Sequence, residues 1–178
     1  MIVTVYLALL RGINVSGQKK VPMTDLRAAF AAQSFSDVST YIQTGNVWFR
    51  AEKADATAIE RALEKSFGFP IPVLLLTQAE FKSIAAGNPF IGQASVDIAN
   101  LHLTLLAGAP EPTAVKELAT VEAGRERFVL KGRAVYLHCP DGYGRAKLNN
   151  NFLERKLGQP ATTRNWKTVS ALLSLAPA

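Results

Sequence analysis

The sequence predicts an α+β fold made of two ferredoxin-like subdomains in tandem. The main observation is the order of the predicted elements, strand–helix–strand–strand–helix–strand, which occurs twice along the 178 residues. In each copy a short glycine-containing turn joins the second strand to the third. The copies share this pattern but not their residues. Because the split βαβ motif forms an antiparallel sheet with strand order 4-1-3-2, we expect two such sheets.

In the first copy, apolar runs predict four strands, and apolar residues at helical spacing predict two helices. Pro22 marks the start of the first helix, and Gly68 supplies a left-handed cap for the second. A hairpin turn at 44–46 contains a glycine and an asparagine, which accept positive φ. The expected strands are 3–10, 38–43, 47–50 and 71–76, and the helices begin at Pro22 and span 55–67.

The second copy follows a connecting segment. Thr77 and Glu80 have capping-box spacing and open a short helix that stops before Gly87. The expected organisation is subdomain 1 at 1–76, the connecting helix and loop at 77–99, and subdomain 2 with a C-terminal helix at 100–178. The expected strands are 100–106, 127–130, 135–139 and 161–163, and the helices are 112–121, 149–157 and 165–175.

The composition favours anionic partners. Twenty Lys and Arg residues against fourteen Asp and Glu give a formal charge of +6 and a pI near 9.6. A globular protein with a mildly basic surface is the plainer alternative.

The single cysteine, Cys139, excludes an intramolecular disulfide. One cysteine and two histidines are also too few ligands for a familiar structural zinc site. We therefore expect no metal, no cofactor, a cytoplasmic location and, because the apolar segment 2–10 is too short to span a bilayer, no membrane association.

One loop resembles a phosphate-binding motif without satisfying it. Gly12 and Gly17 have the glycine spacing of a nucleotide-binding P-loop, which then requires Lys followed by Ser or Thr. Here those positions hold Gln18 and Lys19, and the predicted helix starts several residues later. A nucleotide-hydrolysing P-loop is thus disfavoured. A simple anion nest of backbone amides with Lys19 or Lys20 stays open.

The predicted topology brings polar loops together. In the first sheet, 11–14 should approach the turn at 44–46, and at the opposite edge of the second sheet 141–147 should approach 163–166. Guanidinium, ammonium and amide groups meeting there would suit an anion, unless the glycines only shape turns and the charges are only solvated. The predicted ligand-binding residues are Arg11, Asn14, Asn46, Tyr143, Arg145, Lys147, Arg164 and Trp166.

Strand alternation makes two further predictions. Tyr6, Trp48 and Arg50 should share the face of the first sheet opposite the helices. Such a pair of rings would suit stacked RNA bases, although packing between the subdomains is the preferred explanation. His102 and His138 should share a face of the second sheet, in a structural role rather than as a metal or acid–base pair.

Four segments carry a family resemblance: "ALLRGINVSGQKKVPM", "TYIQTGNVWF", "DGYGRAKLNN" and "TTRNWKTV". Together they resemble a bacterial family catalogued as domain of unknown function 1697. The resemblance implies a cytosolic protein with two ferredoxin-like subdomains and no established activity. Ser16 stands where the family often has glycine, and Ala146 where it often has a hydroxyl residue, which argues against essential hydroxyl chemistry at position 146.

Three hypotheses for function follow. The leading one is binding of an anionic ligand, either a phosphorylated small molecule or nucleic acid. The second is an enzyme acting on a small phosphorylated or carboxylated substrate, with Asp141 or Tyr143 in acid–base chemistry. The third is a scaffold or interaction protein in which the motifs are purely structural.

Overall fold

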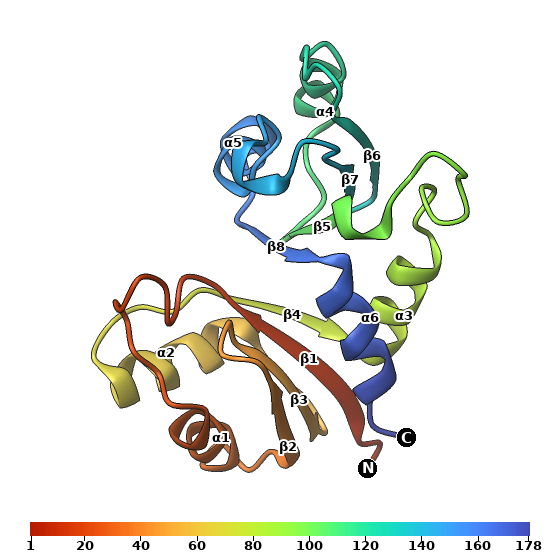
Figure 1. Cartoon of the computed structure of the whole chain (residues 1–178). Helices are drawn as coiled ribbons and strands as arrows, with labels where there is room; N and C mark the ends of the chain where they lie inside the picture. The colour runs from red at the N-terminus through yellow and green to blue at the C-terminus, as the bar shows by residue number, and fades with distance from the viewer. The chain divides into compact units, whose positions relative to one another are not determined.

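The computed structural model describes residues 1–178, which form two compact units. Unit 1 comprises Met1–Ser83 together with Leu175–Ala178, and unit 2 comprises Ile84–Ser174. Each unit contains one four-stranded antiparallel sheet that packs against helices (Figure 1). The predicted α+β fold with two ferredoxin-like subdomains is confirmed.

Unit 1 has the predicted strand order, read from the other edge as β2-β3-β1-β4. Gly68 ends α2 with a φ of 82°, and the predicted capping box forms, since Thr77 N donates to Glu80 Oε2 at 2.8 Å and Glu80 N donates to Thr77 Oγ1 at 3.2 Å. The elements are β1 (Thr4–Leu10), α1 (Met23–Ala31), β2 (Ser36–Tyr41), β3 (Asn46–Ala51), α2 (Ala56–Phe67), β4 (Val73–Thr77) and α3 (Gln78–Ala86).

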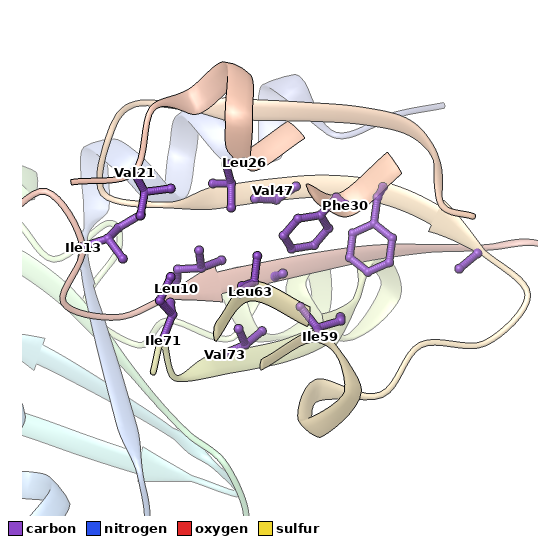
Figure 2. Packing of buried hydrophobic residues seen from close by; sticks show 13 residues of the cluster. Leu10, Ile13, Val21, Leu26, Phe30, Val47, Ile59, Leu63, Ile71 and Val73 are labelled. Atoms are coloured by element: carbon purple, nitrogen blue, oxygen red, sulfur yellow. The ribbon is translucent and has the colours of Figure 1, made fainter. Parts of the chain in front are cut away.

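The core of unit 1 lies between the sheet and its two helices. Figure 2 shows Phe30 of α1 and Leu63 of α2 pointing toward the strands, where Leu10 and Val47 lie. Ile13 and Val21, near the two ends of the loop between β1 and α1, also belong to this cluster and are 1% exposed. The loop is therefore anchored in the core at both ends, which restricts where its polar residues can lie.

Unit 2 repeats the arrangement with the order β6-β7-β5-β8. Its core joins Val135 and Leu137 of β7 to Leu118 of α4 and Leu153 of α5. The last strand is longer than predicted and leads directly into the final helix. The elements are η1 (Ile98–Asn100), β5 (Leu101–Leu106), α4 (Pro112–Ala119), β6 (Arg127–Lys131), β7 (Ala134–His138), η2 (Tyr143–Arg145), α5 (Asn150–Leu157), β8 (Ala161–Asn165) and α6 (Trp166–Leu175).

The register between β1 and β3 corrects the predicted aromatic face. Tyr6 pairs with Phe49 and Leu7 pairs with Trp48, so Tyr6 and Trp48 lie on opposite faces and the prediction was wrong. Tyr6 stacks on Phe49 on the helix-covered face, with ring centroids 5.5 Å apart. Trp48 is 2% exposed and packs edge-on against Phe81 of α3. These rings do not form an exposed platform for bases.

The histidine prediction was wrong for the same reason. Leu101 pairs with His138, and His102 pairs with Leu137, so the two imidazoles lie on opposite faces of the sheet. Alternation along one strand shows which of its residues share a face. Which residues of the neighbouring strand lie on that same face depends on the pairing register, which alternation does not give. No hairpin joins β5 to β7 or β1 to β3, so no turn length sets their registers locally.

Candidate functional site

The loop between β1 and α1 lies against the β2–β3 turn in unit 1, as predicted. Leu10 N donates to Gly45 O at 2.8 Å, and Asn14 Nδ2 donates to Gln43 O at 2.8 Å. An open hollow of about 330 Å³ lies beside these contacts. Its lining residues are Asn14, Gly17, Lys20, Val21, Pro22, Met23 and Gln43.

The glycine-rich part of this loop is a small hairpin rather than a phosphate loop. Asn14 N donates to Lys19 O at 3.1 Å, and Gln18 N donates to Val15 O at 2.9 Å. Ser16 and Gly17, at the centre of the turn, have φ values of 51° and 74°, as a type I′ turn requires. The amides of Asn14 and Gln18 therefore bond within the loop, which does not have the cradle of a P-loop.

Two asparagines predicted to bind ligand hold this loop region together. Asn14 Nδ2 also donates to Val21 O at 2.9 Å, and its Oδ1 accepts from Val21 N at 2.8 Å. Asn46 is fully buried, and its Nδ2 donates to Tyr41 O at 2.9 Å and to Thr44 Oγ1 at 3.1 Å. Both carboxamides thus serve the conformation of the loops. Arg11 is half-buried, and its backbone N donates to Pro72 O at 3.0 Å.

Unit 2 contains a larger pocket of about 520 Å³, which we call the Tyr143 pocket. It lies where the segment after β7 meets the junction of β8 and α6, the two segments that the sequence predicts to converge. Tyr143 and Trp166 are the predicted ligand-binding residues that line it. Its full lining is Ile98, Ala99, His102, Tyr143, Asn165, Trp166 and Lys167.

Tyr143 has a well-defined position in this pocket. Gly142 precedes it with a φ of 90°, a conformation that favours glycine, and turns the chain into η2. The Tyr143 hydroxyl accepts from the backbone N of Asn150 at 2.8 Å, at the first turn of α5. Its ring stacks on His102 with centroids 4.5 Å apart and an interplanar angle of 18°. Both ends of the side chain are therefore held.

A polar network around Asn150 supports this position of Tyr143. The Thr163 hydroxyl donates to Asn150 Oδ1 at 2.8 Å, so the Thr104 hydroxyl, 2.7 Å from that of Thr163, is the donor of that pair. Asn150 Nδ2 donates to Ala161 O at 3.1 Å, and Thr104 is fully buried. The network connects the first residue of α5 to β5 and β8, and so fixes the backbone N that holds Tyr143.

The start of α6 forms another wall. Asn165 Oδ1 accepts from Thr168 N at 2.8 Å and caps the helix. Trp166 is 6% exposed, whereas Lys167 is exposed. The first turn of α6 carries no acidic residue, and none of the lining residues is acidic. The local field therefore favours a negatively charged group.

His102 is an uncharged member of the pocket near neutral pH. Burial lowers the pKa of His102 from its usual 6.5, and the backbone of Asn100 opposes this by less. Its Nδ1 is buried without a hydrogen-bond partner. The imidazole thus adds a flat, neutral ring to the lining rather than a charge.

The other predicted residues of unit 2 lie elsewhere. Arg145 is exposed and outside the lining, and Lys147 Nζ donates to Glu122 O at 2.6 Å. Arg164 pairs with Leu103 and lies on the sheet face opposite His102. Burial lowers the pKa of Arg164 to about 10, so its guanidinium stays protonated at neutral pH. Asp141, a candidate acid–base group, pairs with the Arg125 guanidinium at 2.6 Å.

The sequence prediction missed three polar or charged residues of the pocket: His102, Asn165 and Lys167. Asn165 and Lys167 flank the predicted Trp166, so their position at the end of a strand was the available signal. His102 requires the register of β5, which pairs it with Asn165. No group of three or more His, Cys, Asp and Glu side chains is placed to hold a metal ion, and no helix is long and apolar enough to cross a membrane.

Comparison with known proteins supports the family and the fold. Residues 3–136 match the family described as "Protein of unknown function (DUF1697)". The solved structure of the conserved bacterial protein SP0830 from Streptococcus pneumoniae is similar, with a TM-score of 0.76 and 23% sequence identity over 98% of this chain and 99% of that chain. At this identity the likeness shows the fold alone. No match was found among the curated proteins.

Proposed function

The chain belongs to the DUF1697 family of proteins of unknown function, and we propose that it binds a small anionic molecule in the Tyr143 pocket. One observation carries the proposal: Lys167 lies beside stacked aromatic rings in a pocket of about 520 Å³ that has no acidic lining residue. This volume is typical of small-molecule sites, which measure about 300–1,000 Å³. The formal charge of +6 would also attract an anion.

Lys167 is the group we expect to contact the anion. It is exposed at the second position of α6, so its ammonium can turn toward the pocket without leaving water. The positive end of the α6 dipole lies at the same place and adds to the attraction. Asn165 is occupied in capping that helix, so it positions the turn that carries Lys167.

The proposal keeps part of the predicted site. Tyr143 and Trp166 belong to it, and Arg145 lies in the same short helix as Tyr143, where it can add to the positive field. Arg11, Asn14 and Asn46 belong to unit 1 and form no part of it. A cytoplasmic location, where phosphorylated metabolites occur, remains part of the proposal.

The test uses the full chain and a panel of small anions: inorganic phosphate, ribose 5-phosphate and a dicarboxylate. The chain contains two tryptophans, so its ¹H–¹⁵N spectrum has two indole signals, and Trp166→Phe assigns them. We expect binding to shift the Trp166 signal and not that of Trp48. Lys167→Ala should weaken binding about five- to tenfold, since a hydrogen bond to a charged group contributes about 1.5–3 kcal/mol before screening.

The matched control is Lys156→Ala, which removes an exposed lysine of α5 outside the pocket. Equal affinities for the Lys167 and Lys156 variants, or no shift of Trp166 with any anion, would show that the pocket is not an anion site. A single-stranded oligonucleotide that binds with a steep salt dependence would instead favour the nucleic-acid hypothesis. Absence of binding by all these probes would favour the interaction-protein hypothesis.

A further inference from the structure

The Tyr143 pocket is larger and more aromatic than an inorganic anion requires, and we infer that its ligand is a nucleoside monophosphate. This inference rests on the function proposed above and names the ligand class of that same pocket. Three of the seven lining residues carry aromatic rings: His102, Tyr143 and Trp166. Ile98 and Ala99 add apolar surface. Such a lining suits a ligand with a flat apolar body in addition to its charge.

The rings offer a preformed surface for a base. His102 and Tyr143 already stack on each other, nearly parallel at 18° with centroids 4.5 Å apart, so a base would stack on the outer side of this pair. Because Asn150 N holds the Tyr143 hydroxyl, this ring is ordered before any ligand arrives. Bases commonly stack on Tyr, Trp and His side chains, and every base has a flat face to offer.

The charge of the lining indicates one phosphate. Lys167 is the one lysine or arginine among the lining residues, and no carboxylate among them could hold a metal ion. A triphosphate would bring several negative charges to a single ammonium, whereas a monophosphate, with a charge of about −1.5 to −2 at pH 7, leaves a much smaller excess. Asn165 also lines the pocket, and while its Oδ1 caps α6, its Nδ2 can donate to an oxygen of the sugar or the phosphate.

The experiment measures dissociation constants of the full chain by calorimetry and follows the Trp166 indole signal. The probes are the four nucleoside 5′-monophosphates, the matching uncharged nucleosides, and ribose 5-phosphate. We expect at least one nucleotide to bind about tenfold more tightly than ribose 5-phosphate, because stacking on an aromatic side chain contributes about 1–3 kcal/mol per base. The nucleoside should also bind more weakly than its nucleotide.

Two substitutions at one position isolate the ring. Tyr143→Phe and Tyr143→Leu both remove the hydroxyl bonded to Asn150 N, but only Tyr143→Phe keeps an aromatic face. We expect Tyr143→Phe to retain most of the preference for nucleotide over ribose 5-phosphate, and Tyr143→Leu to lose it. Thermal unfolding of both variants establishes that the comparison is made on folded protein.

The outcomes separate this inference from the proposed function. If ribose 5-phosphate binds through Lys167 and no nucleotide binds more tightly, the anion site stands and the nucleotide is excluded. If neither binds, both fail. If a nucleoside binds as tightly as its nucleotide, the phosphate is not recognised and both fail as stated. An oligonucleotide that binds much more tightly than every mononucleotide would overturn a free mononucleotide as the ligand.

Discussion

Asn14 links three segments of unit 1 through one carboxamide. Its side chain bonds to Val21 N, Val21 O and Gln43 O, while its own backbone has a φ of 54°. Asparagine tolerates this left-handed conformation better than most residues because its short polar side chain can bond to nearby backbone. Asn14, one of the predicted ligand-binding residues, therefore holds these three segments together.

We expect Asn14→Ala to lower the free energy of unfolding by about 2–4 kcal/mol, because three hydrogen bonds of about 1 kcal/mol each are lost and alanine is strained at this φ. Urea unfolding measures the change. Asn14→Gly removes the strain but not the loss of hydrogen bonds, so it should fall between Asn14→Ala and the wild type.

Gln18→Ala, an exposed change in the same loop, serves as the control and should be nearly neutral. If Asn14→Ala unfolds at the same urea concentration as Gln18→Ala, the hydrogen bonds of the Asn14 side chain do not contribute to stability.

At the level of elements, the two hairpins of the repeat differ in how closely their turns pack. Gly45, in the β2–β3 turn, has a φ of 90°, and a Cβ there would lie 2.7 Å from Leu10 Cβ and 2.9 Å from Ile13 Cδ1. Gly132, in the β6–β7 turn, has a φ of 58° with nothing within 4 Å of its Cβ position. Only the first turn is pressed against a neighbouring loop.

Replacing each glycine with alanine should therefore lower the free energy of unfolding by different amounts. We expect Gly132→Ala to destabilise by about 1–2 kcal/mol through backbone strain, and Gly45→Ala by about 1–3 kcal/mol more, because the methyl group also displaces the β1–α1 loop. Urea unfolding of both variants provides the comparison. If both variants lose the same free energy of unfolding, the residues around Gly45 adjust to the added methyl group without a further loss of stability.

The element level also shows which parts of the fold were predictable. The cap at Gly68, the Thr77–Glu80 capping box and the order of strands depend on local patterns and short connections, and all agree with the structure. The faces of Tyr6 and His102 depend on registers between strands that no hairpin joins, and both were misassigned. A shift of one residue moves every side chain to the other face.

At the level of the whole molecule, each unit has its own sheet and its own buried cluster. Cys139 belongs to the cluster of unit 2 and is 1% exposed. Burial raises the pKa of this thiol to about 11, and Glu126 adds to the effect. The thiolate is the reactive form, and the buried thiol must become exposed before it can ionise. The rate at which Cys139 reacts therefore measures how often unit 2 opens.

We expect iodoacetamide to modify Cys139 far more slowly in the native protein than in urea, as measured by mass spectrometry. A Ser170→Cys change, at an exposed position of α6, should react rapidly under native conditions and is the control. Leu137→Ala, in the same cluster, should speed the reaction of Cys139 more than Gly45→Ala in unit 1. Rapid modification of native Cys139 would contradict the buried position.

The sequence by itself determined the order of the elements, their caps, the strand order of both sheets and the pairs of loops that meet at the sheet edges, because these depend on local periodicity and short connections. Only the tertiary structure decided which side chains remain available there. Asn14, Asn46 and Lys147 donate to backbone carbonyls, whereas the register of β5 brings His102 beside Asn165 and into the Tyr143 pocket. Hydrogen-bond partners and registers join residues distant in the sequence, where no local pattern specifies them.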